Sequence, residues 1–217
     1  MRPELVSIDV TVSVLMRRHG RTYAEDAGIS LRDEPSPLWQ LLVLSLLLSA
    51  RIRSDIAVAA ARELSRAGYR TPAAMRDASW QHRVSALGRG RYRRYDERTA
   101  TMLGEMAEAV LDNYSGDLRR LRDGSDDIER DLQKFKGIGP TGAAIFCREV
   151  QGVWPQLAPY VDGLAADGAE RLGLPRSPER LAGLVPPLDL PRLVAACVRA
   201  ARRDDVVDDV VDHVRRG

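Results

Sequence analysis

The apolar segment from Leu38 to Ser49 constrains the fold of this 217-residue chain more than any other feature. A helix over these residues is apolar on almost every side, so we expect other elements to bury it on most faces. The composition suits packed helices, because 44% of the residues are hydrophobic and only 5% are aromatic. The apolar run is too short to cross a bilayer, and no signal peptide opens the chain, so we expect a cytoplasmic protein.

Two patterns conflict near the N-terminus. Alternate residues from Val6 to Val14 are apolar, as in a half-buried strand. Nothing later in the chain alternates in this way, and a lone strand leaves its backbone groups unpaired. The apolar stripe of Ile8, Val12 and Leu15 is helical, and we therefore predict a helix here.

Helix signals recur through the rest of the chain, which predicts an all-α fold. Before the central segment, Ser36 is the predicted N-cap and Pro37 the first helical residue. Further helices are predicted at residues 54–67, from 71, at 80–87, 95–114, 125–134, 140–150, 163–172, from 177, and at 191–202 and 204–215.

The stretch FKGIGPTGAAIF, residues 135–146, predicts a tight turn that leads directly into a helix. Gly137 and Gly139 allow backbone angles that side chains forbid and permit close approach of another molecule. Pro140 suits the first helical position. Free N–H groups and the positive end of the helix dipole favour an anion at such a turn, for example a DNA phosphate. A helix connection without a ligand is the alternative.

A basic loop at residues 88–95 interleaves positive charge with flat rings. Arg91, Arg93, Arg94 and Tyr95 suit a sugar-phosphate backbone and an unstacked base, and a solvated loop is the alternative. The net charge of +2 permits nucleic-acid binding without requiring it.

These segments together resemble the helix-hairpin-helix (HhH-GPD) DNA glycosylase superfamily, in particular endonuclease III. The shared pattern covers residues 35–174: an apolar helix ending in LLSA, an Asp, a TPAAM segment, the hairpin, and then Val-Asp. The resemblance implies two helical lobes with a cleft between them. Residues 32–154 would form the central bundle, and residues 1–31 and 155–217 the second lobe.

The resemblance also implies a catalytic role for Asp162. A carboxylate can stabilise the oxocarbenium-like sugar cation that forms when a base leaves, although an N-cap role is equally compatible with the sequence. Thr141 occupies the position where bifunctional relatives carry a Schiff-base lysine. The resemblance therefore implies a monofunctional glycosylase that leaves an abasic site, with Thr141 positioning water or touching the sugar.

DNA contacts are expected from the hairpin residues Lys136, Gly137, Ile138 and Gly139. Arg51 follows LLSA where several relatives place a glutamine that enters the gap left by the extruded base. Arginine could fill that gap and bond the orphaned partner base, or it could lie on the surface. Asp55 matches a family aspartate that we interpret as structural, because it would brace the loop or cap a helix.

No cofactor or metal is expected. Cys147 and Cys197 lie in apolar helical patterns, where we expect them to be buried, and the family's four-cysteine iron–sulfur loop is missing. The histidines are isolated in the sequence and show no metal-ligand spacing, so we expect them to be structural or solvated: His19, His82 and His213.

The expected partner is double-stranded DNA with a damaged or mispaired base, bound by a monomer without membrane association. The excised base is left open. Two other functions also remain open: a non-catalytic protein that recognises distorted or abasic DNA, and a lyase that uses Lys134, Lys136 or the N-terminal amine.

Overall fold

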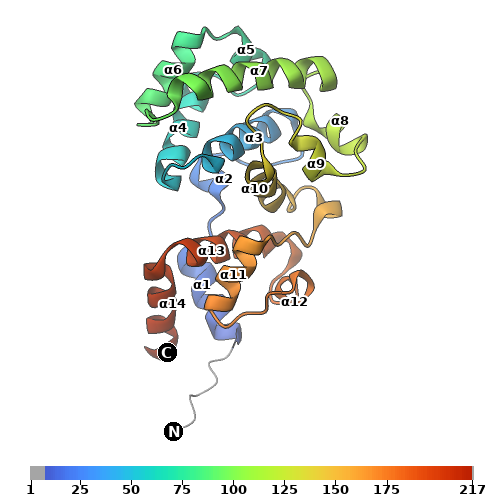
Figure 1. Cartoon of the computed structure of the whole chain (residues 1–217). Coiled ribbons are helices and arrows are strands. Elements are labelled where there is room, and N and C mark those ends of the chain that lie inside the picture. Colours follow the sequence, from blue (N-terminus) through green and yellow to red (C-terminus); the bar gives the residue numbers. More distant parts are fainter. Residues whose placement is uncertain (1–7, 217) are drawn as a thin grey trace. The chain divides into compact units, whose positions relative to one another are not determined.

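The computed structural model describes residues 8–216, and these residues form helices and connecting segments without a strand (Figure 1). The predicted all-α fold is therefore confirmed for this part of the chain. The chain divides into two compact units. The central unit is Tyr23–Val153, and the terminal unit combines the residues as far as Thr22 with those from Trp154 onward. Within residues 8–216, every helix is too short or too polar to cross a membrane.

The helices of the central unit follow one another with short connections. They are α2 (Tyr23–Asp26), α3 (Pro35–Ser49), α4 (Ser54–Arg66), α5 (Pro72–Asp77), α6 (Trp80–Arg89), α7 (Asp96–Tyr114), α8 (Leu118–Asp123), α9 (Ile128–Leu132) and α10 (Pro140–Val150).

Helix α3 is the core of the central unit. The side chains of Leu38, Trp39, Leu42 and Leu44 are fully buried, because α4 and α10 pack against α3. The apolar character of the segment around its whole circumference is thus matched by burial on most faces.

The predicted start of α3 is wrong by two residues. Glu34 is the N-cap residue and Pro35 is the first helical residue, without a side-chain cap. Ser36 does not cap the helix because its hydroxyl donates a hydrogen bond to the carbonyl oxygen of Arg70, at 2.8 Å. Proline at the first position costs no hydrogen bond, which explains why the helix can begin there.

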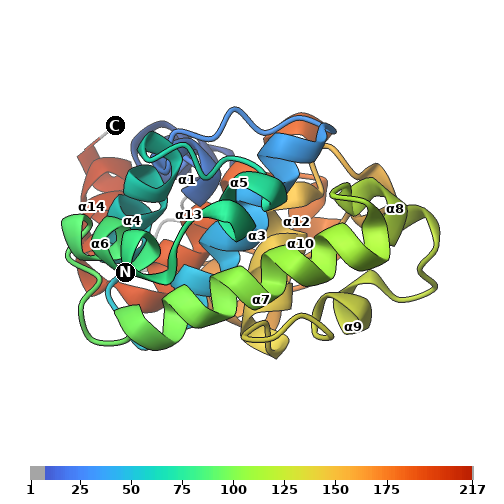
Figure 2. The ribbon, with the colours of Figure 1, turned by 90° about the horizontal axis from the view of Figure 1, so that it is seen from above.

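Helix α7 packs against α5 and α6, and Figure 2 shows its long ribbon beside these two shorter helices. Arg83 of α6 connects the three helices, because its guanidinium group donates to the carbonyl oxygens of Met75, Ala78 and Ala100 at 2.8–3.0 Å. Burial lowers the pKa of Arg83. The three carbonyl oxygens offset the cost of burying the charged guanidinium group in an apolar environment.

The start of the central unit depends on one buried carboxylate. Glu149 of α10 accepts hydrogen bonds from the backbone N–H groups of Tyr23 and Ala24, at 3.1 and 2.9 Å. A carboxylate at the N-terminus of a helix also interacts favourably with the helix dipole. Residues 23–31, which the sequence assigned to the second lobe, belong to the central unit, and the bonds to Glu149 hold the first two of them there.

The terminal unit brings the two ends of the described chain together. Its helices are α1 (Ile8–His19), α11 (Gly163–Arg171), α12 (Pro178–Ala182), α13 (Leu190–Arg202) and α14 (Asp204–Arg216), with 3₁₀ turns at Pro155–Leu157 and Pro187–Asp189. Helix α1 packs against α13 and α14, as the blue and red ribbons of Figure 1 show.

Helix α1 (Ile8–His19) confirms the predicted N-terminal helix, while Val6 lies outside the described residues. Val12 and Leu15 are buried, but Ile8 is 41% exposed, so the apolar stripe is only partly covered. Elsewhere in this unit, α11 lies directly on α13. A Cβ atom at Gly168 would overlap the carbonyl oxygen of Cys197, so only glycine permits this contact.

Candidate functional site

The hairpin turn, residues 133–139, connects α9 to α10, which pack against each other (Figure 1). Phe135 and Ile138 are buried and anchor it to the central unit. The ring of Phe135 meets Tyr114 edge to face at a centroid distance of 5.9 Å. The N–H of Ile138 donates to the carbonyl oxygen of Phe135 at 3.0 Å, so neither the amide nor the side chain of Ile138 is directed at a ligand.

The two glycines of the hairpin turn have different roles. Gly137 adopts a φ of +91°, and a Cβ atom there would lie 2.6 Å from Leu46 and 2.7 Å from Met102. Glycine is therefore favoured at this position by the backbone conformation, and an added Cβ atom would also displace two side chains. Gly139 has an extended conformation with a φ of −98°, which any residue adopts. A Cβ atom at Gly139 would meet nothing within 4 Å, so the backbone there is open to an approaching molecule.

Helix α10 begins without a side-chain cap. Gly139 is its N-cap residue and Pro140 has no N–H to offer. In the described part of the chain, the N–H groups of Gly139 and Thr141 donate to no protein acceptor, and Thr141 is exposed. Unsatisfied donors at the positive end of an 11-residue helix attract an anion.

Both lysines of the chain lie in the hairpin turn, and both are paired with carboxylates. Lys136 Nζ lies 3.1 Å from Glu105 Oε1. Lys134 Nζ lies 2.8 Å from Asp131 Oδ1. Each ammonium group is thus held by an acid on the surface of the central unit.

A pocket of about 310 Å³, called the α3–α7 pocket below, adjoins the hairpin turn. Its lining combines the end of α3 (Leu46, Ser49), the residues that follow it (Ala50, Arg51), the basic loop and α7 (Tyr92, Tyr95, Arg98, Thr99, Met102) and the hairpin glycine Gly137. The structure thus brings together three of the segments that the sequence singled out. Its volume is at the lower end of the range for small-molecule sites, roughly 300 Å³ and above.

Arginines near this pocket lack carboxylate partners. In the described residues, the side chains of Arg51, Arg91, Arg93 and Arg98 are exposed and form no hydrogen bond or ion pair. Many arginines elsewhere in the described residues are paired with carboxylates, among them Arg18, Arg53, Arg66, Arg119 and Arg122. The α3–α7 pocket and the basic loop therefore carry positive charge that the protein does not neutralise.

The basic loop is more ordered than its glycines suggest. Tyr92 is 1% exposed and bonds Thr99, so its ring is a buried anchor and not a platform for a base. Arg91 adopts a φ of +63°, which is uncommon for a residue other than glycine. Tyr95 is half-buried and lines the pocket, and the guanidinium of Arg94 lies over its ring, 5.2 Å from the centroid.

Sequence reasoning missed Arg98, Thr99 and Met102 as pocket residues. A signal was present, because positions 95, 98, 99 and 102 follow the i, i+3, i+4, i+7 spacing that places residues on one helix face. Tyr95 was among the predicted DNA contacts. The residues on the same face of the following helix, Arg98, Thr99 and Met102, could have been predicted from it.

Asp55 lies in the first turn of α4, where its carboxylate accepts two hydrogen bonds from Arg53 at 3.0 and 2.7 Å. These bonds lower the pKa of Asp55. The residue is exposed and is not part of the pocket lining. Its contacts agree with a bracing role for the segment between α3 and α4.

Asp162 belongs to the terminal unit, where it is the N-cap residue of α11. One carboxylate oxygen, Oδ1, accepts a hydrogen bond from the N–H of Ala165 at 2.9 Å. The predicted N-cap is thus confirmed, and the side chain is held in one orientation. The catalytic role of Asp162 stays a prediction.

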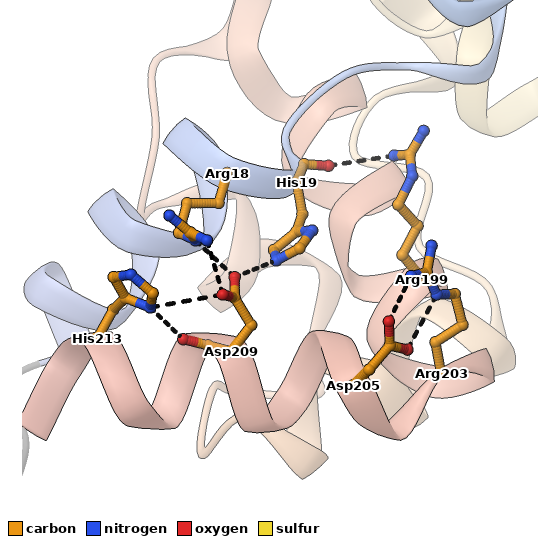
Figure 3. A network of polar contacts seen from close by, with 7 residues as sticks. All are labelled: Arg18, His19, Arg199, Arg203, Asp205, Asp209 and His213. Carbon is orange, nitrogen blue, oxygen red and sulfur yellow. Dashed lines mark hydrogen bonds and ion pairs between the residues drawn. The ribbon is translucent and has the colours of Figure 1, made fainter.

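Two of the three histidines, isolated in the sequence, meet at one aspartate in the terminal unit (Figure 3). Asp209 of α14 accepts two hydrogen bonds from Arg18, and its Oδ2 lies 2.8 Å from His19 Nε2. His213 Nδ1 lies 2.7 Å from the carbonyl oxygen of Asp209. This network joins α1 to α14 and supports the predicted structural role of His19. In residues 8–216, no group of His, Cys, Asp or Glu side chains is arranged to hold a metal ion.

No protein-family model and no curated protein matches the sequence. Among solved structures, the chain is similar to an endonuclease III trapped as a covalent intermediate with DNA in an estranged-adenine complex. The TM-score is 0.49 and the sequence identity is 17%, over 85% of this chain and 83% of that chain. At this identity and TM-score, the function must be inferred from the residues of the site themselves.

Proposed function

We propose that the protein is a monofunctional DNA glycosylase that binds double-stranded DNA around a damaged or mispaired base and hydrolyses the bond from that base to its deoxyribose. The observation that carries this proposal is the collection of unpaired arginines around the α3–α7 pocket, together with the open N–H groups of Gly139 and Thr141 at the start of α10. Phosphate oxygens satisfy both kinds of donor, and the pocket admits a planar base next to Tyr95.

The chemistry is assigned to Asp162. As the base leaves, positive charge develops on the sugar, and a carboxylate stabilises it and orients the attacking water. Its bond to the N–H of Ala165 holds the side chain in position before DNA binds. Such preorganisation means that less of the binding energy is needed to orient the catalytic group.

The proposed absence of lyase activity is supported by Thr141 and by the ion pairs of the two lysines. A Schiff base requires a neutral amine that is free to attack the sugar. Thr141 has none, and Lys134 and Lys136 are both engaged by carboxylates. The product is therefore an abasic site in an uncut strand. Borohydride is expected to trap no covalent adduct between the protein and DNA.

The test compares the wild type with Asp162→Asn on DNA that carries a panel of lesions, with mass spectrometry of the released bases. Asparagine is as good an N-cap residue as aspartate, so α11 keeps its start while the negative charge is lost. We expect base release to fall at least about 100-fold, in line with the loss of a transition-state charge contact, and DNA affinity to be retained.

Asp127→Asn is the matched control, because Asp127 caps α9 in the same way, by accepting from the N–H of Arg130 at 2.9 Å. This variant should release bases at the wild-type rate. Equal excision rates for Asp162→Asn and Asp127→Asn would show that Asp162 is not the catalytic acid. If the wild type releases no base but binds distorted or abasic duplexes, the non-catalytic function suggested by Pro140 and Thr141 replaces the enzymatic one.

A further inference from the structure

A second pocket, called the α3–α4 pocket below, lies within the central unit between the beginning of α3 and the end of α4. Its volume of about 390 Å³ falls within the range of small-molecule sites, roughly 300–1,000 Å³. Its lining combines the segment before α3 (Gly28, Ile29, Ser30, Arg32, Glu34), the first two turns of α3 (Ser36, Pro37, Gln40), and the end of α4 with a residue after it (Ser65, Arg70). It shares no lining residue with the α3–α7 pocket.

Four of the lining residues form a closed ring of hydrogen bonds. The side-chain amide of Gln40 donates to the hydroxyl of Ser36 at 3.2 Å, and that hydroxyl donates to the carbonyl oxygen of Arg70 at 2.8 Å. The Nε–H of Arg70 donates to the hydroxyl of Ser65 at 3.0 Å, and this hydroxyl donates to the amide oxygen of Gln40 at 3.2 Å. Such a ring fixes the wall of the pocket before any ligand arrives.

The ring leaves the outer part of the Arg70 guanidinium group unused. Its Nε atom bonds Ser65, whereas its two terminal nitrogens have no acceptor in the described residues. Arg32 and Glu34 are exposed, and within residues 8–216 their side chains form no hydrogen bond or ion pair. The lining thus offers two cations and one carboxylate, and its net charge is positive.

We propose that the α3–α4 pocket binds a small phosphomonoester that also carries hydroxyl groups, such as a sugar phosphate. A phosphomonoester has close to two negative charges at neutral pH and three acceptor oxygens, so it can satisfy both guanidinium groups. A hydroxyl of the same ligand can donate to the carboxylate of Glu34. Without such a donor, this carboxylate would repel the anion.

The ligand site is separate from the proposed DNA surface. It adjoins the first turns of α3, whereas the α3–α7 pocket adjoins the last turn. Ser36 and Ser49 are roughly 20 Å apart along the helix axis, at about 1.5 Å per residue. The carboxylate of Glu34 also disfavours a DNA strand, because phosphodiesters and the deoxyribose rings between them offer no hydroxyl donor. The site therefore goes beyond the proposed function and does not depend on it.

Isothermal titration calorimetry of the whole chain with four compounds tests the ligand class. The compounds are glucose 6-phosphate, glucose, gluconate and inorganic phosphate, which separate the phosphate group, the hydroxyl groups and a carboxylate in place of the phosphate. We expect glucose 6-phosphate to bind more tightly than the other three compounds. Its advantage over glucose should be at least about 10-fold, which corresponds to one charge-assisted hydrogen bond.

Arg32→Gln and Glu34→Gln test the two parts of the site. Because the side chain of Arg32 forms no bond in the described residues, its replacement leaves the ring intact. This variant should bind glucose 6-phosphate about 10-fold more weakly or worse. Glu34→Gln removes a charge that repels phosphate and attracts hydroxyl groups. It should therefore lower the affinity for glucose 6-phosphate relative to the affinity for inorganic phosphate.

Arg98→Gln is the matched control, because Arg98 is also exposed and unpaired in the described residues but lines the α3–α7 pocket. This variant should bind glucose 6-phosphate as the wild type does and bind duplex DNA more weakly. Arg32→Gln should show the opposite pattern, with normal DNA affinity. Fluorescence anisotropy at one fixed salt concentration measures the DNA affinities.

The outcomes separate this inference from the proposed function. A wild type that binds gluconate best, or glucose 6-phosphate no better than glucose, overturns the ligand class and leaves the glycosylase proposal intact. Equal affinities of Arg32→Gln and the wild type for glucose 6-phosphate, or equal losses in Arg32→Gln and Arg98→Gln, overturn the location of the site. A protein that binds glucose 6-phosphate through Arg32 but binds no DNA supports the ligand site and overturns the proposed function.

Discussion

Replacement of Gly137 by alanine should destabilise the central unit. At a φ of +91° an alanine lies in a region that L-residues avoid, which costs about 1–2 kcal/mol. Its Cβ atom would also lie 2.6 Å from Leu46 Cδ1 and 2.7 Å from Met102 Sδ. Both atoms belong to the outer parts of flexible side chains that can move aside, so their displacement adds at most about 1 kcal/mol. The expected loss in the free energy of unfolding is therefore about 1–3 kcal/mol.

Gly139→Ala provides the contrast within the same turn. Its φ of −98° suits alanine, and the new methyl group would meet no atom within 4 Å. Alanine is a poorer N-cap than glycine, but it also reduces the entropy of the unfolded chain, so the two effects offset each other to within about 0.5 kcal/mol. The methyl group would stand beside the open N–H groups at the start of α10, and DNA affinity should fall.

Urea unfolding followed by circular dichroism measures the stabilities, and anisotropy with a duplex containing an abasic-site analogue measures DNA binding. Gly137→Ala should unfold at a lower urea concentration than the wild type, and Gly139→Ala should unfold at nearly the same concentration as the wild type with weaker DNA binding. Equal midpoints for all three proteins would refute the structural role of Gly137. Unchanged binding by Gly139→Ala would refute the phosphate contact at α10.

Two further predictions concern titrating side chains in the core and at the surface. The hydrogen bonds from Arg18, with a smaller contribution from His19, lower the pKa of Asp209 to about 2. Because the folded pKa lies below the unfolded one, this carboxylate stabilises the fold above about pH 4 and loses that effect as the pH falls towards 2. Asp209→Asn should therefore unfold more easily than the wild type at pH 7, and the difference should shrink in acid; a constant difference would contradict this. Burial raises the pKa of Cys147 and of Cys197 to about 12, so Ellman's reagent at pH 8 should label neither thiol until urea unfolds the protein.

Local sequence patterns were enough to identify most of the helices. The apolar circumference of α3 identified it as the core helix, and the Gly137–Pro140 signal identified the hairpin turn and the first residue of α10. Asp162 was identified as an N-cap residue, which the structure confirms. These features depend on residues a few positions apart, whose backbone preferences and hydrogen bonds act over one or two helical turns.

Contacts between distant segments could not be read in this way. The sequence pattern does not show that Gly139 has an ordinary backbone conformation while Gly137 is confined by Leu46 and Met102. Nor does it show that Ser36 bonds Arg70 instead of capping α3. Such outcomes are set by which side chains fill the space around a residue, and those side chains come from other helices.

The candidate site illustrates the same division. The chain is rich in arginine, but pairing with carboxylates neutralises many of these cations and leaves Arg51 and Arg98 free at one pocket. The α3–α7 pocket itself exists only because the end of α3, one face of α7 and the hairpin turn meet. Charge and helix propensity are properties of residues, whereas a recognition pocket is a property of the packing that brings those residues together.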